Sequence, residues 1–296
     1  MKFADLWRDG VGFWRVWVVT LGRRHGILEA LPRRPAGVAK TPLRLWIDAA
    51  LALGVVVRRG GRIVPAPGAR DLLIDRRHPD YLAGHLMYGA LRSLDYDAFG
   101  RFFARGATLN QLARPRRLEA IEEATAWDHA MFLRRLPSDV RRKLVRGCDV
   151  LELGCGTGAW LRMMRRAFPR SRFEGVDPDP EAGAKAGRAE TFGRAGSRDV
   201  IYLGEVLHVA DRARTLKNCA RVLRPGGKLL VLEGFMPERV SARPMEAVLF
   251  AMQLDQALQG VRFMRRSDLK LPGAFSPPKF IRFGGCVALA VATRLG

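Results

Sequence analysis

The second half of the chain alternates short apolar runs with segments of helical character, and this alternation restricts the fold more than any other feature of the sequence. The runs are CDVLELG (148–154), RFEGVD (172–177), DVIYLGEVLH (199–208), GKLLVLEGF (227–235), PKFIRFG (278–284) and CVALAVATR (286–294). Near-continuous apolar strands separated by helices are typical of a parallel sheet that is covered on both faces. Residues 147–296 are therefore predicted to form a doubly wound α/β domain, whose ligands bind outside the carboxyl ends of the strands.

The first 30 residues carry an apolar stripe at helical spacing that is rich in tryptophan. Its members are Phe3, Leu6, Trp7, Phe13, Trp14, Trp17, Val18 and Leu21. Such a stripe belongs either to a core face or to a subunit interface, because exposed aromatic helix faces usually find a partner. The sequence leaves both alternatives open.

A helix followed by a hairpin is predicted next. The segment 43–53 has helical apolar spacing and ends at Gly54, and the β-branched runs 55–57 and 63–64 flank the turn sequence RRGGR. A helix with a two-stranded wing describes a winged-helix unit, a module that serves DNA binding in some proteins and dimerisation in others. Residues 1–80 are accordingly predicted to form a winged-helix-like domain.

Residues 81–146 are predicted to be helices that bridge this domain to the α/β domain. Weak breaks are expected at Gly100 and Gly106. The last of these helices is predicted to begin with Ser138 as its N-cap and to end at Gly147.

The net charge of +22 raises the alternative of a nucleic-acid partner. The basic residues are scattered along the chain as short pairs, however, and the segment 43–53, which would be the recognition helix, holds only Arg44 as a base. A nucleic-acid surface is therefore not favoured.

Cellular context follows from what the sequence lacks. No apolar run approaches the roughly 18 residues that cross a bilayer, and the N-terminus has acids and Trp7 where a signal peptide would be apolar. The four cysteines form no CxxC pair. We expect a cytoplasmic protein without a membrane span, with buried thiols rather than disulfides, and without a metal site.

The segment LELGCGTG predicts the ligand of the α/β domain. Gly154, Gly156 and Gly158 follow the first predicted strand and let the backbone approach a ligand closely, while Glu152 stands just before them. An acid there would repel a pyrophosphate but suits a positively charged amine. Asp177, at the end of the second strand, is placed to accept hydrogen bonds from ribose hydroxyls. A cationic amino-acid tail with a ribose and no phosphate describes S-adenosylmethionine.

These residues carry a resemblance to a known family. VLELGCGTG, GVDPDP and RVLRPGGKLLVLE resemble the signature blocks of class I S-adenosylmethionine-dependent methyltransferases, which have a seven-stranded Rossmann-like sheet. With the winged-helix start and the bridging helices, nearly the whole chain resembles the O-methyltransferases of plant phenylpropanoids and bacterial aromatic metabolites. The resemblance implies dimerisation through residues 1–80. It also implies a set of cofactor-binding residues: Glu152, Gly154, Gly156, Asp177, Glu190 and Leu203.

The same resemblance implies the catalytic residues. EVLHVAD is similar to the family's VLHDWxD block, which places His208 as the general base, and Glu233 matches the acid that orients this histidine. A histidine suits the removal of a proton from a hydroxyl, and a neighbouring acid fixes its tautomer. The alternative is a structural role, in which His208 is a helix-start residue bonded to a backbone carbonyl.

The sequence also departs from the family. QGVRFMRRS offers Arg262 or Phe263, and no acid, where the family has a second acid near the histidine. GRAETFGRAGSRD lacks the usual acid for the adenine amino group and offers Glu190 as a substitute. HDW becomes HVA, and a proline-broken segment, MRRSDLKLPGAFSPPKF, replaces the usual long final helix.

Substrate contacts are predicted from two segments. WDHAM resembles the family's FxxAM segment and indicates Trp127 and Met131, and the methionine-rich helix PMEAVLFAMQLDQAL adds Phe250 and Met252. The leading hypothesis is an O-methyltransferase that acts on a small aromatic or apolar hydroxylated metabolite as a homodimer. The alternatives are an RNA or DNA methyltransferase and a non-catalytic winged-helix protein that binds S-adenosylmethionine. Neither an Asn/Asp-Pro-Pro-aromatic block nor a Pro-Cys nucleophile supports base methylation.

Overall fold

The computed structural model describes residues 2–108, 114–180 and 183–296. The chain divides into two compact units, Met1–Asp97 with Leu112–Met131, and Ala98–Gln111 with Phe132–Gly296. The predicted bridging segment 81–146 is divided between the two units: α4 (Ala83–Ser93) belongs to the first and α7 (Ser138–Arg146) to the second. The long helix α6 (Arg114–Arg135) contributes residues to both.

The first unit is helical apart from one hairpin. Besides α4 it contains α1 (Phe3–Arg24), α2 (Ile27–Ala30), α3 (Lys40–Ala52), β1 (Val56–Arg59), β2 (Arg62–Pro65), η1 (Arg70–Ile74) and the start of η2 (Tyr96–Ala98). β1 and β2 pair antiparallel, as the RRGGR turn predicts. Gly60 and Gly61 both have positive φ, 54° and 72°, which the two-residue turns that match strand twist require.

The core of the first unit forms around α1, α3 and the hairpin. Val18, Leu28, Trp46 and Val56 are buried together, and the indole N–H of Trp46 donates a hydrogen bond to the carbonyl oxygen of Val18 at 2.9 Å. The predicted stripe on α1 divides in two. Its C-terminal part reaches this core at Val18, whereas six of its members remain exposed: Phe3, Leu6, Trp7, Phe13, Trp14 and Leu21.

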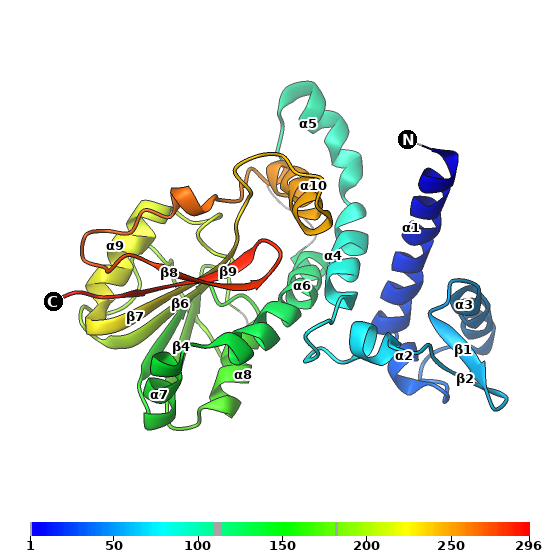
Figure 1. The fold of residues 1–296 in the computed structure, drawn as a ribbon, viewed down its shortest axis with the longest axis horizontal. Helices are drawn as coiled ribbons and strands as arrows, with labels where there is room; N and C mark the ends of the chain where they lie inside the picture. The colour runs from blue at the N-terminus through cyan, green and yellow to red at the C-terminus, as the bar shows by residue number, and fades with distance from the viewer. Residues whose placement is uncertain (1, 109–113, 181–182) are drawn as a thin grey trace. The chain divides into compact units, whose positions relative to one another are not determined.

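The second unit is built around a seven-stranded sheet with the order β5-β4-β3-β6-β7-β9-β8 (Figure 1). Its strands are β3 (Asp149–Leu153), β4 (Arg172–Asp177), β5 (Lys185–Ala186), β6 (Arg198–Gly204), β7 (Leu223–Gly234), β8 (Lys279–Gly284) and β9 (Val287–Thr293). Its further helices are α5 (Phe99–Arg105), α8 (Ala159–Ala167), α9 (Arg212–Val222), α10 (Pro244–Leu258) and η3 (Arg266–Asp268).

The prediction of a parallel sheet holds for β3 to β7 and is wrong for the last two strands. β3, β4, β5, β6 and β7 pair in parallel, whereas β9 pairs antiparallel with both β7 and β8. The physical reason is the connection: only residues 285–286 separate β8 from β9, and a parallel crossover needs a dozen residues or more.

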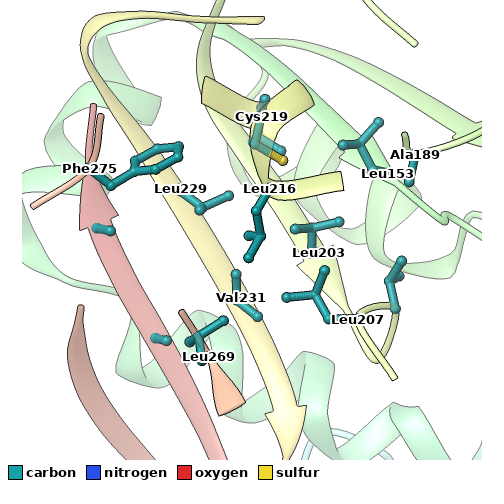
Figure 2. Packing of buried hydrophobic residues seen from close by; sticks show 14 of the residues in the cluster. Leu153, Ala189, Leu203, Leu207, Leu216, Cys219, Leu229, Val231, Leu269 and Phe275 are labelled. Atoms are coloured by element: carbon teal, nitrogen blue, oxygen red, sulfur yellow. The ribbon is translucent and has the colours of Figure 1, made fainter. Parts of the chain in front are cut away.

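Helices cover both faces of this sheet, as a doubly wound fold requires. On one face, Leu216 and Cys219 of α9 pack with Leu203 of β6 and with Leu229 and Val231 of β7 (Figure 2). On the other face, Trp160 of α8 stacks on Tyr202 of β6 with ring centroids 4.1 Å apart. Adjacent residues of β6 thus point to opposite faces, and apolar packing on both sides explains why the strand is apolar throughout.

Several predicted helix boundaries require correction. Ser138 is the first residue of α7 and its side chain makes no capping bond, because Pro137 occupies the N-cap. Gly100 lies inside α5, whereas Gly106 ends that helix in a left-handed conformation with φ 64°. Gly147 ends α7 as predicted. In place of a long final helix, only the short η3 precedes β8.

The four cysteines are free thiols, as predicted. Cys148, Cys155 and Cys219 are buried and Cys286 is half-buried. Burial raises the pKa of the Cys219 thiol to about 12, so it remains protonated at neutral pH. Within the described residues, no helix is both long and apolar enough to cross a bilayer.

Candidate active site

The glycine-rich loop follows β3 and leads into α8. The N–H groups of Gly154 and Cys155 donate to the carbonyl oxygen of Val176 at 2.8 and 3.1 Å, which ties the loop to the end of β4. Gly154 and Gly156 have positive φ, 76° and 48°. A Cβ on Gly154 would come within 2.5 Å of the Val206 side chain, whereas one on Gly156 would meet no atom within 4 Å. Gly154 therefore serves close packing, and Gly156 leaves open space beside bare backbone.

Glu152 is a buried acid with an unsatisfied oxygen. Its side chain lies on β3 and the residue is 4% exposed. Its Oε2 has no hydrogen-bond partner among the described residues. Burial first, and the negative charge of Asp177 second, raise the pKa of this carboxyl well above its ordinary value. An orphaned buried carboxyl oxygen beside an open loop indicates that a donor, best of all a cation, completes the site when a ligand is bound.

Asp177 connects the end of β4 to the glycine-rich loop. Its Oδ2 accepts a hydrogen bond from the N–H of Gly156 at 2.9 Å, and its Oδ1 accepts one from the N–H of Asp179 at 3.0 Å. A carboxylate has about four acceptor positions, so these two bonds fix its orientation and leave capacity for ligand hydroxyls.

His208, in the turn that follows β6, and Glu233, near the end of β7, form a close pair. Nδ1 of His208 lies 2.8 Å from Oε2 of Glu233, which is completely buried. Oε1 of Glu233 accepts the backbone N–H groups of Val206 and Leu207 at 3.0 and 2.7 Å. These bonds hold the carboxylate rigidly against the turn that carries His208. Because Nδ1 faces Glu233, Nε2 is the ring nitrogen that can take a proton from a substrate.

Two further residues lie against the imidazole. Oε2 of Glu205 is 3.8 Å from Nδ1 of His208. This distance is too long for a hydrogen bond but short enough for a substantial electrostatic interaction. The ring of Phe263 lies 5.2 Å from the imidazole, centroid to centroid. Gln253 on α10 holds the segment of Phe263 by accepting its backbone N–H at 2.9 Å. The His208 side chain is thereby left only 7% exposed.

Glu205, His208 and Glu233 are also a group of the described residues in which potential metal-ligand atoms lie within 4.8 Å of one another. The contacts of Glu233 account for both its oxygens, one on two backbone N–H groups and the other on the imidazole. This pattern is that of an acid that orients an imidazole.

The remaining predicted cofactor residues are found at the same end of the sheet or in the core. Oε1 of Glu190 accepts the backbone N–H of Asp211, the N-cap of α9, at 3.1 Å, and its Oε2 lies 3.6 Å from Nε of Arg188. The side chain of Leu203 is completely buried in the hydrophobic core (Figure 2), so a contact with the cofactor would have to come from its backbone. Roles for both residues in cofactor binding stay predictions.

The predicted substrate residues fall in both units. In the first unit, Met131 is buried, and the indole N–H of Trp127 donates to the carbonyl oxygen of Pro79 at 2.5 Å. In the second unit, Phe250 and Met252 are half-buried on α10. The Trp127 indole therefore has a structural partner of its own, and no contact with a substrate is yet tested for any of the four.

The model of a family described as a methyltransferase domain matches residues 121–271, about half of the chain and most of the second unit. The chain belongs to this methyltransferase family. It is an S-adenosylmethionine-dependent methyltransferase, and S-adenosylmethionine is its cofactor.

Named relatives agree with this assignment. The 3-hydroxy-5-methyl-1-naphthoate 3-O-methyltransferase of Streptomyces sahachiroi is 25% identical over 285 residues, and the match covers 82% of this chain and 80% of that relative. The structure of human N-acetylserotonin methyltransferase in complex with S-adenosylmethionine superposes with a TM-score of 0.67 at 17% identity, over 100% and 99% of the two chains. An O-methyltransferase family protein from Burkholderia thailandensis gives 0.66 at 15%, also over 100% and 99%. At these identities the two structures establish the fold.

The residues of this methyltransferase fit S-adenosylmethionine. The orphaned Oε2 of Glu152 would meet the cofactor's amine, the open backbone at Gly156 would lie along its amino-acid tail, and Asp177 would hold its ribose. A phosphate-bearing nucleotide would instead bring negative charge against two acids.

Two residues of the site, Glu205 and Gln253, were missed from the sequence, and a third, Phe263, was one of the two residues that the sequence offered in place of the family's second acid. Glu205, Phe263 and Gln253 touch or hold the surroundings of His208. The spacing of Glu205, three residues before His208, was a usable signal, because a tight turn after a strand brings such residues together. The sequence did not decide between Arg262 and Phe263, and the structure places Phe263 against the imidazole.

Proposed function

We propose that this methyltransferase methylates a hydroxyl oxygen of a small aromatic or apolar metabolite, with His208 as general base and Glu233 as its orienting acid. One observation carries the proposal: the glycine-rich loop and the His208–Glu233 pair are adjacent. Val206 lies between them, because its side chain sits against Gly154 while its N–H donates to Glu233. A cofactor loop and an oriented base are thereby held in one place.

The proton transfer follows from the geometry of the pair. S-adenosylmethionine supplies a methyl group carried on a positively charged sulfur. A hydroxyl is a weak nucleophile until it loses its proton, and Nε2 of His208 is the atom that accepts it. Glu233, at 2.8 Å from Nδ1, fixes the tautomer and stabilises the imidazolium that forms. Burial of the pair keeps water from competing for this proton.

The nature of the acceptor is inferred from the relatives and from α10. The name of the naphthoate 3-O-methyltransferase denotes methylation of a hydroxyl on a naphthoate ring. A second relative is a desmethyl-yatein O-methyltransferase from Sinopodophyllum hexandrum, 28% identical over 151 residues that cover 47% of this chain and 42% of that relative. Half-buried Phe250 and Met252 on α10 suit a flat apolar ligand. Met131 and Trp127 are proposed as further contacts by resemblance.

Dimerisation through the N-terminal residues is a separate part of the proposal. α1 exposes Phe3, Trp7 and Trp14 by 81%, 68% and 64%, more aromatic surface than a lone helix usually leaves in water. α3 with the β1–β2 hairpin supplies the winged-helix-like element of the predicted dimerisation domain. Analytical ultracentrifugation of wild-type protein and of Trp7→Glu tests this part. A wild-type monomer would refute it.

Activity is tested with purified protein in two steps. Calorimetric titration with S-adenosylmethionine and S-adenosylhomocysteine should show micromolar binding of both. A panel of naphthols, catechols and hydroxynaphthoates is then offered with labelled methyl donor, next to the matching methyl ethers as unreactive controls. Methylation of tRNA or DNA, with no hydroxylated compound accepted, would overturn the proposal in favour of a nucleic-acid methyltransferase.

A further inference from the structure

The backbone at Glu205 is unusual among the described residues. It is the one non-glycine residue there with a positive φ, 55°. Its N–H still donates to the carbonyl oxygen of Leu232, a residue of β7, at 2.8 Å. The chain leaves the sheet immediately after this bond. Left-handed backbone is unfavourable for glutamate, and residues held in it cluster at functional sites. Glycine would adopt this φ without strain, so the retained glutamate side chain calls for an explanation.

The left-handed turn directs the Glu205 carboxylate back toward His208. Its Oε2 lies 3.8 Å from Nδ1, and the side chain is 22% exposed, so the interaction is electrostatic and only partly screened. Glu233 of β7 contacts the same nitrogen at 2.8 Å. Among the described residues, the charged groups that face the imidazole are Glu205 from its own turn and Glu233 from β7, while Phe263 covers it with an uncharged ring.

Phe263 occupies the side of His208 from which a second carboxylate could otherwise come. The sequence predicts no acid in the QGVRFMRRS segment, and the structure places an aromatic ring there, 5.2 Å from the imidazole. This segment therefore contributes no carboxylate to the surroundings of His208. Glu205 supplies a carboxylate to the ring from the turn after β6 instead, and its backbone is strained.

We propose that Glu205 is a positioning residue of the transfer reaction, a second carboxylate that holds His208 by charge and stabilises its protonated form. This inference rests on the proposed role of His208 as the base. When a hydroxyl proton moves to Nε2, the ring gains a positive charge that two carboxylates then share. The proton later leaves Nε2 for solvent.

The test uses full-length variants that separate charge from backbone strain. Glu205→Gln removes the charge and keeps the side-chain length. Glu205→Asp and Glu205→Asn form a matched pair, because both residues tolerate left-handed backbone and they differ mainly in charge. Chemical shifts of the imidazole nitrogens are measured by NMR in the cofactor-free protein, with the His208 signals assigned by their loss in His208→Ala. Methyl transfer is measured as kcat and kcat/KM against pH.

If Glu205 acts by charge, the Gln and Asn variants lower the ratio of doubly protonated to neutral His208 ring at a fixed pH near 6.5 by about threefold or more. Their kcat falls about 3- to 10-fold, and the acid limb of kcat/KM moves to lower pH by about half a pH unit or more. The Asp variant stays close to wild type in both readouts.

Other outcomes overturn one proposal or the other. Unchanged ring protonation in Gln and Asn variants refutes the role of Glu205, even where activity falls, because the loss would then be structural. Equal behaviour of the Asp and Asn variants also refutes it. If ring protonation responds as expected but the wild type methylates no hydroxyl compound, the charge contact stands and the proposed function fails.

Discussion

Replacing Glu152 by glutamine should have opposite effects on the fold and on cofactor binding. The carboxyl is buried on β3, with Oε2 unsatisfied and Asp177 adding negative charge. In the folded protein its pKa is raised well above the ordinary value of 4.5. Above that ordinary pKa the unfolded chain releases the proton while the folded protein retains it, so the acid lowers the stability of the fold as pH rises. Glu152→Gln should therefore stabilise the cofactor-free protein at pH 8 and change little at pH 4.

The effect on the cofactor has the other sign. A buried hydrogen bond between a carboxylate and an ammonium is worth about 1.5–3 kcal/mol. Its loss corresponds to roughly a 10- to 150-fold rise in the dissociation constant of S-adenosylmethionine. Because the bound amine favours the ionised carboxylate, cofactor binding to the wild type should also release a proton and strengthen with pH, up to the titration of the amine itself near pH 7.7–8.

Calorimetry in buffers of different ionisation enthalpy measures both the affinity and the released proton, and urea unfolding at pH 4 and 8 measures stability. Asp149→Asn is the matched control on the same strand. The pKa of Asp149 is lowered, chiefly by its hydrogen bond with Arg172, so its loss should destabilise the fold and spare cofactor binding. Unchanged affinity in Glu152→Gln would refute the contact with the amine. A loss of stability at pH 8 would show that the carboxyl has a structural role instead.

Three further substitutions test the remaining assignments. Asp177→Ala should weaken cofactor binding by about 1–3 kcal/mol through lost ribose hydrogen bonds, measured by the same titration; equal affinity would remove Asp177 from the site. His208→Ala should spare cofactor binding and lower kcat by roughly 100-fold or more, and retained turnover would mean that proximity alone drives transfer. Asp128 is buried, its Oδ1 has no hydrogen-bond partner in the part of the chain that the structure describes, and burial raises its pKa from 3.8 to about 7. As pH rises from about 4 to 7, the unfolded chain releases this proton before the folded protein does, so the fold loses stability. Asp128→Asn should therefore stabilise the protein at pH 8 by up to about 4 kcal/mol and match wild type near pH 4, as measured by urea unfolding. A constant difference across that pH range would exclude titration of Asp128 as the cause.

Local features of the sequence were sufficient to predict where the glycine-rich loop and its two acids lie in the sheet. Gly154, Gly156 and the acids Glu152 and Asp177 lie at or beside strand ends, where turn geometry and the pattern of apolar residues fix both the fold and the ligand side of the sheet. The RRGGR hairpin was predictable for the same reason, since two adjacent glycines determine the turn. The hairpin turn is decided within a few residues, whereas the glycine-rich loop is also tied to the end of β4, where Asp177 accepts the N–H of Gly156.

Long-range packing decided the rest. The strand order that inserts β9 antiparallel between β7 and β8 depends on which edges meet, and the position of Phe263 over His208 joins segments 55 residues apart in the chain. The left-handed backbone of Glu205, which brings a second carboxylate to the base, follows no local preference of glutamate. The sequence by itself determined which cofactor the sheet holds, because that depends on turn chemistry. Only the tertiary structure decided what surrounds His208, because those charges and rings come together through the packing of β6, β7 and α10.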